Sequence, residues 1–481
     1  MYLQIKKSMS KSISVIFIML ILIIKIDAQP TFLVKPYLQV GYEGKQQELS
    51  LLWHTSDTIS QWLVEVKTNA NWVASKVINF NIVNVKDVSP FVVYHATLKD
   101  LEFGKEFSYR VSNNNKIVFE SKAHAPKSKN QDYKFVVVGD IGALTKDQKK
   151  LATIMNDLNP DFVAVPGDIV YENGLIKDYT QKFWPIYNAD QSDASGVPLM
   201  RRIPFIAAVG NHDAEDRDMD KTPSALSYYY FWEQPLNGLS LKEGSSMVPV
   251  LKGSDENKKA FYTAAGKAYP SMSNFSYNYA NAHWTVIDAD NYVDWTDSTL
   301  LKWVKNDLLN SSEVKWHFVL FHHPGFNSSR EHYEQQQMRL LSPIFEAGKV
   351  DIVFNGHVHN YQRSYPLTFI PDRKGVQLIG GKDNKTLRGR LVNGKWILDK
   401  KFDGITNTQP NGILYLVTGA GGQELYNPEQ ENDSDSWQKF TYKFFSTDHS
   451  LTYIEAKENT LQIKQIASSG KVVDEFKVTK K

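Results

Sequence analysis

The sequence predicts an all-β domain followed by a larger α/β domain, and three observations support this prediction. Residues 32–125 contain short segments in which apolar and polar residues alternate, as they do in half-buried strands. From residue 133 onward, short apolar segments alternate with an amphipathic helical segment and polar loops, which is typical of α/β folds. The polar segment 125–131 separates the two patterns. We therefore expect a division into residues 32–125 and residues 133–481.

The composition excludes several classes of protein. Of the 481 residues, 42% are hydrophobic and 22% are charged, which is ordinary for a globular protein and argues against disorder. The formal charge is +2 and no block of like charges occurs, so we expect no nucleic-acid partner. The chain contains no cysteine, which excludes disulfides, thiolate metal ligands and cysteine nucleophiles. Any metal must therefore be bound by oxygen and nitrogen atoms.

Residues 1–28 have the pattern of a secretory signal peptide. Lys6, Lys7 and Lys11 precede an apolar run at residues 13–24, and Ala28 supplies the small residue at the cleavage point. The apolar run is short for a membrane span, although an uncleaved anchor is the alternative interpretation. We therefore expect a secreted or periplasmic protein that leaves the membrane when the signal peptide is cleaved.

Residues 32–125 predict a β-sandwich. Three sets of alternating apolar residues mark its strands: Leu49, Leu51 and Trp53; Trp62, Val64 and Val66; Phe107, Tyr109 and Val111. Roughly 95 residues of such strands, separated by turn-rich segments, fit a two-sheet sandwich. The run Leu98, Leu101, Gly104, Phe107 and Tyr109 also resembles the corner of a fibronectin type III-like domain.

The α/β domain begins with a β-α-β unit. Residues 134–138 predict a buried strand that ends before Asp140, and Thr145 with Gln148 predicts a capping box at the start of a helix. One face of that helix is apolar, with Leu151, Ile154, Met155 and Leu158. Pro160 ends the helix, and residues 162–165 predict the next buried strand.

Five predicted strands end in polar residues that are able to bind a metal ion. These residues are Asp140, Asp168 with Tyr171, Asn211 with His212, His322, and His357 with His359. Ligands of α/β sheets gather beyond the carboxyl ends of the strands. Carboxylate, phenol, amide and imidazole groups suit iron, manganese or zinc. Each residue alone has a structural interpretation, as a turn, a helix cap or a hydrogen-bonded histidine, but the set of five predicts a metal centre.

The same segments resemble the five blocks of the metallophosphoesterase superfamily. They read Gly139-Asp140-Ile141-Gly142, Gly167-Asp168-Ile169-Val170-Tyr171, Gly210-Asn211-His212-Asp213, Val319-Leu320-Phe321-His322 and Gly356-His357-Val358-His359. Tyr171 is similar to the tyrosine that marks the purple acid phosphatase family. Residues 356–363 read GHVHNYQR, close to that family's GHVHAYER. The preceding β-sandwich and a C-terminal strand pair at residues 461–478 also resemble its larger members, so the resemblance covers nearly the whole mature chain.

The resemblance implies a fold, a metal centre and a reaction. The fold is an α/β metallophosphoesterase-type sandwich, in which two facing mixed sheets are flanked by helices, and residues 133–481 form a calcineurin-like catalytic domain with C-terminal strands. Fe(III) would be bound by Asp140, Asp168, Tyr171 and His359. A second, divalent metal (Zn, Fe or Mn) would be bound by Asp168, Asn211, His322 and His357. The implied reaction is the hydrolysis of a small phosphomonoester by a metal-bound hydroxide at acidic pH.

Two further histidines are expected to contact the substrate. His212 directly follows the predicted ligand Asn211, and His332 lies ten residues beyond His322, where the family places a substrate-contacting histidine. Either side chain would bind a phosphate oxygen or protonate the leaving group, and the alternative for both is a structural role. His323 is interpreted as a packing residue, and Tyr361 and Arg363 as residues that brace the loop of His357.

Other interpretations of the sequence stay open. A phosphodiesterase would use the same metal ligands, and a non-catalytic protein that binds phosphate or glycan would carry a vestigial site. The intact set of ligands argues against a vestigial site. The aromatic segment 228–232 follows Asp213 in an unusually long connection, and it is either a packing element or a wall of the substrate cleft.

Overall fold

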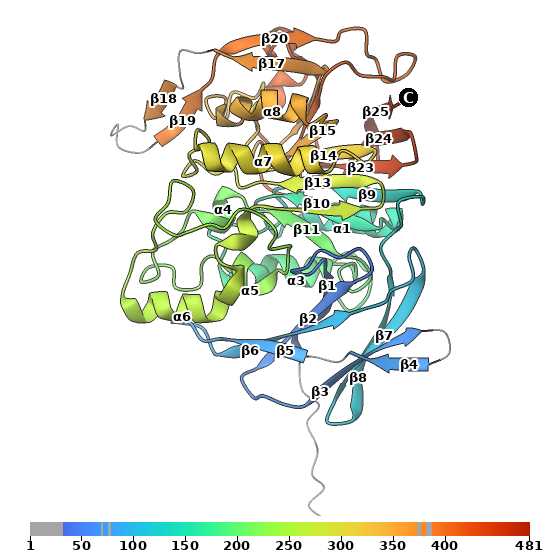
Figure 1. Cartoon of the computed structure of the whole chain (residues 1–481), viewed down its shortest axis with the longest axis vertical. Helices are drawn as coiled ribbons and strands as arrows, with labels where there is room; N and C mark the ends of the chain where they lie inside the picture. The colour runs from blue at the N-terminus through green and yellow to red at the C-terminus, as the bar shows by residue number, and fades with distance from the viewer. Residues whose placement is uncertain (1–31, 69–70, 76–77, 373–376, 381–386) are drawn as a thin grey trace, which may run out of the picture.

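A computed structural model describes residues 32–68, 71–75, 78–372, 377–380 and 387–481. The predicted signal peptide, residues 1–28, lies outside the described residues. In Figure 1 the strands of the N-terminal region, drawn in blue, lie at the bottom of the molecule, and the sheets of the α/β region lie above them.

The N-terminal region is all β, as predicted. Its described strands are β1 (Phe32–Gln39), β2 (Leu49–Ser56), β3 (Trp62–Thr68), β4 (Asn71–Ala74), β5 (Ile78–Val83), β6 (Phe91–Leu98), β7 (Glu106–Asn113) and β8 (Lys116–His124). They form two four-stranded sheets, with the orders β1-β2-β6-β5 and β4-β3-β7-β8. Trp53, Val64 and Tyr109 are buried in one core between them, because alternate residues of a strand point to the same face.

The α/β region contains two large sheets. The first has the order β11-β10-β9-β23-β24-β25 and consists of β9 (Tyr133–Val137), β10 (Phe162–Pro166), β11 (Phe205–Ala208), β23 (Ser450–Ala456), β24 (Thr460–Ala467) and β25 (Val472–Thr479). The second has the order β12-β13-β14-β15-β21-β16-β22. It consists of β12 (Phe275–Tyr279), β13 (Ala282–Val286), β14 (Trp316–Leu320), β15 (Ile352–Asn355), β16 (Tyr361–Ser364), β21 (Leu414–Thr418) and β22 (Thr441–Phe445).

Two hairpins and a set of helices complete the described chain. The hairpins pair β17 (Leu367–Pro371) with β20 (Gly394–Leu398), and β18 (Gln377–Gly380) with β19 (Leu387–Leu391). The α-helices are α1 (Lys146–Leu158), α2 (Ile176–Asp178), α3 (Trp184–Tyr187), α4 (Asn211–Ala214), α5 (Tyr228–Phe231), α6 (Asp255–Ala265), α7 (Ser298–Asn310) and α8 (Ser342–Ala347). Among the described helices, none is long and apolar enough to cross a membrane.

Aromatic side chains fill the space between the two large sheets. Phe135 of β9 stacks on Phe162 of β10, with ring centroids 5.0 Å apart. From the other sheet, Trp284 meets Phe135 edge to face at 5.3 Å and packs on Phe318 at 4.7 Å. These rings are fully buried, and large aromatic surfaces contribute strongly to core stability. The two sheets therefore face each other across one core, as the predicted sandwich requires.

Helix α1 begins with half of the predicted capping box. The Thr145 hydroxyl accepts a hydrogen bond from the Gln148 backbone at 3.2 Å, as expected. The Gln148 side chain instead accepts from the backbone of Leu144 at 2.7 Å and donates to a carbonyl of the next connection. The reciprocal bond was therefore predicted wrongly, because Gln148 is fully buried and turns inward. Asn159, with φ of 48°, ends the helix before Pro160.

The aromatic segment 228–232 is a packing element between the two regions. All five of its side chains are buried in the main core. His54 of β2 stacks on Phe231 at 4.9 Å, and the Tyr37 hydroxyl of β1 donates to the Phe231 carbonyl at 2.8 Å. The structure thus favours packing over the alternative of a cleft wall for these rings, and the rings join the N-terminal sheets to the α/β region.

Candidate metal centre

The predicted ligands follow strands whose carboxyl ends meet at one edge of the sandwich. β9, β10 and β11 are parallel neighbours in one sheet, and β13, β14 and β15 are parallel neighbours in the other. The loops after these strands carry the predicted residues: Asp140 after β9, Asp168 and Tyr171 after β10, Asn211 and His212 after β11, His322 after β14, and His357 and His359 after β15. Parallel pairing therefore brings together side chains that are far apart in the sequence. Asp140 and His359, which meet here, are separated by 219 positions.

Glycines make this close approach possible. A Cβ at Gly210 would lie 2.2 Å from Oδ1 of Asp168, and one at Gly167 would lie 2.6 Å from Nδ1 of His322. A Cβ at Gly356 would lie 2.7 Å from Oδ2 of Asp140. Each of these glycines precedes a predicted ligand, so the ligand loops touch one another where any larger residue would push the polar groups apart.

Three of the predicted ligands form one half of the centre. The Tyr171 hydroxyl donates a hydrogen bond to Oδ1 of Asp140 at 2.8 Å and lies 3.2 Å from Nε2 of His359. Nε2 of His359 also lies 3.4 Å from Oδ1 of Asp140. The other ring nitrogen of His359, Nδ1, contacts the Glu424 carbonyl at 2.7 Å, which turns Nε2 toward the two oxygens.

Four predicted ligands form the other half, around Nε2 of His322. This atom lies 3.1 Å from Oδ1 of Asn211, 3.2 Å from Oδ2 of Asp168 and 3.2 Å from Nδ1 of His357. Nδ1 of His322 contacts the Pro166 carbonyl at 2.8 Å, so Nδ1 carries the proton of the neutral ring and Nε2 presents a lone pair. Four lone-pair atoms therefore converge on one another.

The charges of the site fit a bound cation. Burial lowers the pKa of His322, but the charge of Asp168, its hydrogen bond to the ring, the charge of Asp140 and the Pro166 carbonyl together outweigh burial and raise that pKa to about 9. A proton on Nε2 of His322 bonds to one of the three facing atoms, whereas a metal ion satisfies all of them. Burial also raises the pKa of the Tyr171 phenol well above its usual value, and the charges of Asp140 and Asp168 raise it further. Oxygen and nitrogen groups arranged in this way suit iron, zinc or manganese.

Three of the predicted ligands have strained backbone conformations. Asp140, Asp168 and His357 have φ of 61°, 50° and 66°, in the left-handed region that side chains rarely adopt. Such conformations persist where the surrounding structure imposes them, and they cluster at functional sites. The Asp213 carboxylate imposes part of this geometry, because it accepts hydrogen bonds from the backbones of Ile169 and Gly210 at 3.2 and 3.0 Å.

His212 and His332 lie beside the predicted ligands. Nε2 of His212 lies 3.9 Å from Oδ2 of Asp168, its Nδ1 contacts the Glu172 carbonyl, and its ring packs on that of Tyr171 at 4.4 Å. The ring of His332 packs on that of His357, with centroids 4.0 Å apart. The structure therefore brings all nine of the predicted site residues together.

Sequence reasoning missed two neighbours of the centre. Tyr426 stacks on His359 at 4.1 Å and also contacts His332 at 5.5 Å. It lies in a loop after β21 with no motif of its own, so no local signal marks it. His323 was interpreted as a packing residue, and it is fully buried, but its ring lies against that of His357 at 4.0 Å.

Tyr361 and Arg363 turn away from the centre. The Tyr361 hydroxyl donates to Asp474 of β25 at 2.8 Å, and the Arg363 guanidinium makes two hydrogen bonds to the same carboxylate at 2.7 and 2.9 Å. All three side chains are largely buried. They join β16 to β25, and this contact supports the strand that follows the loop of His357 and His359.

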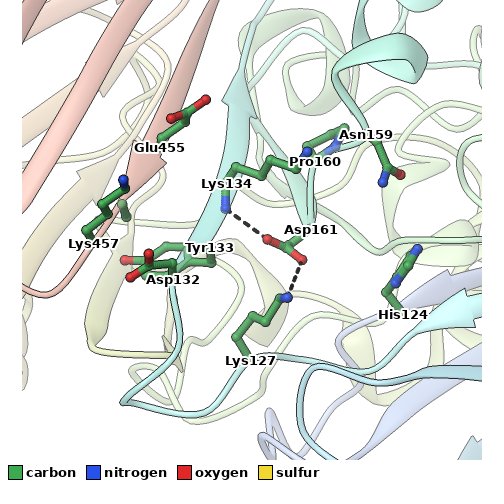
Figure 2. Close-up of a pocket in the computed structure, with 11 residues that line it drawn as sticks. His124, Lys127, Asp132, Tyr133, Lys134, Asn159, Pro160, Asp161, Glu455 and Lys457 are labelled. Atoms are coloured by element: carbon green, nitrogen blue, oxygen red, sulfur yellow. Dashed lines mark hydrogen bonds and ion pairs between the residues drawn. The ribbon is translucent and has the colours of Figure 1, made fainter.

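A separate hollow of about 260 Å³ lies at the opposite edge of the β9 sheet. Lys134 and Asp161 line it at the amino ends of β9 and β10, together with His124 of β8 and Lys127 of the connecting segment. Figure 2 shows Asp161 between the Lys127 ammonium, 3.6 Å away, and the Lys134 backbone, 2.8 Å away. Both acidic and basic side chains line the hollow, in contrast to the convergent acceptors of the metal centre.

Comparisons with known proteins agree with this geometry. Residues 133–361 match the family model described as calcineurin-like phosphoesterase. The chain is 29% identical over 283 residues to purple acid phosphatase 1 of Ipomoea batatas, covering 56% of this chain and 52% of the relative. It is 25% identical over 295 residues to phosphoenolpyruvate phosphatase of Allium cepa, covering 59% and 53%. The chain thus spans about half the length of the curated relatives that it matches.

Solved structures share the fold. A purple acid phosphatase from yellow lupin (Lupinus luteus) seeds aligns with a TM-score of 0.62 at 17% identity, covering 92% of this chain and 74% of that one. The structure of PhoD aligns with a TM-score of 0.53 at 12% identity, covering 92% of each chain. At these identities the likeness is one of fold, and it extends over both regions of the chain.

Proposed function

We propose that this chain, whose residues 133–361 match the calcineurin-like phosphoesterase model, is a phosphatase that hydrolyses phosphomonoesters at a dinuclear metal centre. The observation that carries the proposal is the convergence of Asp168, Asn211 and His357 on Nε2 of His322. The adjacent contact of Tyr171 with Asp140 and His359 supports a second ion beside the first.

We assign the two ions to the two halves of the centre. Asp140, Tyr171 and His359 would hold Fe(III), because a phenolate oxygen and a carboxylate favour a trivalent ion. Asn211, His322 and His357 would hold a divalent ion, namely Zn, Fe or Mn. Asp168 would be shared, since its Oδ2 lies 3.2 Å from Nε2 of His322 and its carboxylate also acts on the Tyr171 phenol, whose pKa it raises. When bound, the two cations supply positive charge for the phosphate oxygens and lower the pKa of water at the centre.

His212 and His332 are the proposed catalytic residues. Nδ1 of His212 is engaged by the Glu172 carbonyl, and this leaves Nε2 near Asp168, at the rim of the centre. From there the ring would donate a proton to the departing alkoxide or a hydrogen bond to the phosphate. His332, with its ring against His357, would contact the phosphate from the other half.

The domain division and the location are part of the proposal. Residues 133–481 would act as one catalytic domain, because β23, β24 and β25 complete the sheet that contains β9. Residues 32–125 would form a fibronectin type III-like domain. The signal-like residues 1–28 support export to the periplasm or beyond, without a membrane anchor after cleavage. The balanced charge supports a small phosphorylated substrate rather than nucleic acid.

The test combines metal analysis with a substrate panel. Purified protein should contain two metal ions per chain and should hydrolyse nitrophenyl phosphate faster than bis(nitrophenyl) phosphate, with an acidic optimum. Asp168→Asn should lose both activity and metal. Asp351→Asn is the matched control, because Asp351 is also a buried carboxylate but lies before β15, at the amino end of that strand.

Two outcomes would replace the proposal. Faster hydrolysis of the diester would indicate a phosphodiesterase that uses the same ligands. Two bound ions without turnover of any phosphate ester would indicate a binding protein.

A further inference from the structure

The three histidines at the centre are not held in the same way. His322 and His359 each direct Nδ1 to a backbone carbonyl, at 2.8 and 2.7 Å, and present Nε2 to the centre. His357 is reversed, because its Nδ1 faces the centre. Among the residues that the structure describes, Nε2 of His357 is buried and has no hydrogen-bond partner. Apart from the contact of Nδ1 with His322, no hydrogen bond of the described residues therefore sets the orientation of the His357 ring.

Ring packing holds His357 instead. The centroid of the His323 ring lies 4.0 Å from that of His357, with 38° between the planes. The ring of His332 lies at the same distance, with 41° between the planes. Contacts this close restrict rotation of the His357 ring, because any turn would bring its atoms into its neighbours.

His323 is set in place by the two parallel strands before it. It directly follows His322 at the end of β14, and Asp290 lies beyond the end of the neighbouring strand β13. Nδ1 of His323 lies 3.4 Å from Oδ1 of Asp290, and the ring meets that of His322 edge to face at 5.1 Å. Both His323 and Asp290 are fully buried.

Burial of His323 beside Asp290 is energetically unfavourable. Within the described part of the chain, neither ring nitrogen of His323 and neither carboxylate oxygen of Asp290 makes a hydrogen bond. Buried polar groups without hydrogen bonds are destabilising, whereas an apolar residue of similar size would pack there without that cost. A residue that only fills the core would therefore not be expected to be a histidine beside an aspartate.

We propose that His323, held beside Asp290, is a positioning residue that fixes the ring of the metal ligand His357 and so sets the affinity of the divalent half of the centre. The proposal rests on the proposed dinuclear function. In this proposal the flat face of His323 orients the ring of His357, as a backbone carbonyl oxygen orients the rings of His322 and His359. It also links His332, the proposed substrate contact, to the same ligand ring.

The test is titration of the metal-depleted full chain with Co²⁺, whose visible absorption reports the ligand geometry. His323→Ala should bind the second equivalent of Co²⁺ roughly 10- to 100-fold more weakly than the wild type, the usual cost of losing support for a ligand. Its Co²⁺ spectrum should also change. His323→Phe keeps a flat ring and should restore most of the affinity. His323→Leu, which fills the space without a flat face, should behave as His323→Ala and serves if the alanine variant does not fold.

His54→Ala is the matched control for lost stability. His54 is also buried and stacks on an aromatic ring, that of Phe231, but in the N-terminal region. The His54→Ala variant should have a lower melting temperature and an unchanged affinity for Co²⁺. Wild-type affinity in both His323→Ala and His323→Leu, or an equal loss in His323→Phe, would overturn the proposal. A wild type that binds a single ion would instead overturn the dinuclear centre itself.

Discussion

The phenol of Tyr171 donates a hydrogen bond to Oδ1 of Asp140 across 2.8 Å, and both side chains are buried. The phenol is 31 positions further along the chain and comes from the loop of the neighbouring strand. A buried phenol between carboxylates keeps its proton unless a cation replaces it, so under the proposed function Fe(III) would be held at this contact.

Tyr171→Phe should remove the colour of the iron-loaded protein. A phenolate bound to Fe(III) gives a charge-transfer band in the visible range, and phenylalanine lacks the oxygen that makes it. The variant should also hold iron less well, because the site loses one anionic oxygen. Absorption spectra and iron analysis of both proteins check this, and the assignment fails if the wild type is colourless with iron bound or if the variant keeps the band.

His212→Ala should retain both metals and lose roughly 10²- to 10⁴-fold in turnover of alkyl phosphates, the usual contribution of general acid–base catalysis. The loss should shrink with nitrophenyl phosphate, whose leaving group needs less protonation. Steady-state kinetics with both esters provide the measurement. Equal losses would show that His212 binds the phosphate and does not protonate the leaving group.

Gly210→Ala should abolish metal binding while the fold persists. Its new methyl group would lie 2.2 Å from Oδ1 of Asp168, so the shared ligand would have to move. Gly470→Ala is the control, because no atom lies within 4 Å of its Cβ position, and it should cost only the strain of a positive φ, about 1 kcal/mol. Metal stoichiometry and far-UV circular dichroism of both variants decide the matter, and full metal content in Gly210→Ala would contradict the prediction.

Phe231→Ala should destabilise the whole chain. Phe231 is buried against His54 and Trp184, and loss of a buried phenylalanine costs about 3–5 kcal/mol. Phe80→Ala, at a side chain that is 42% exposed on β5, should change the free energy of unfolding far less. Denaturant unfolding, followed by signals from both regions, should show one shifted transition. Two separated transitions in the wild type would mean that the aromatic segment does not couple the regions.

The sequence predicts the ligand edge well because its signals are local. Each buried strand is a short apolar run, and the first polar residues after it, such as Asp140 or His322, must lie at the carboxyl edge. The side of a helix that faces the core is also local, as Leu151 and Met155 of α1 illustrate. In such cases a few neighbouring residues contain the whole reason for the structure.

Contacts between distant segments were not predictable in the same way. No residue pattern near Tyr426 predicts that its ring stacks on His359, 67 positions earlier. Likewise, no pattern near His323 predicts that its ring packs on that of His357. The inward turn of Gln148 depends on a carbonyl of Lys182 in another connection. These details follow from the packing of completed elements, and a single sequence contains no periodic signal for them.

The position of β9 in its sheet has a consequence for the order in which the protein folds. β9 lies between β10, which follows it closely, and β23, whose residues 452–456 pair with residues 133–137. Pairing between strands more than 300 residues apart is slow, because closing such a large loop loses conformational entropy before the strand contacts form. The strand that leads to Asp140 therefore lacks one of its two neighbours until residues 452–456 have been synthesised. Under the proposed export, such late pairing would leave β9 and β23 apart while the chain crosses the membrane, and the first sheet would be completed on the far side.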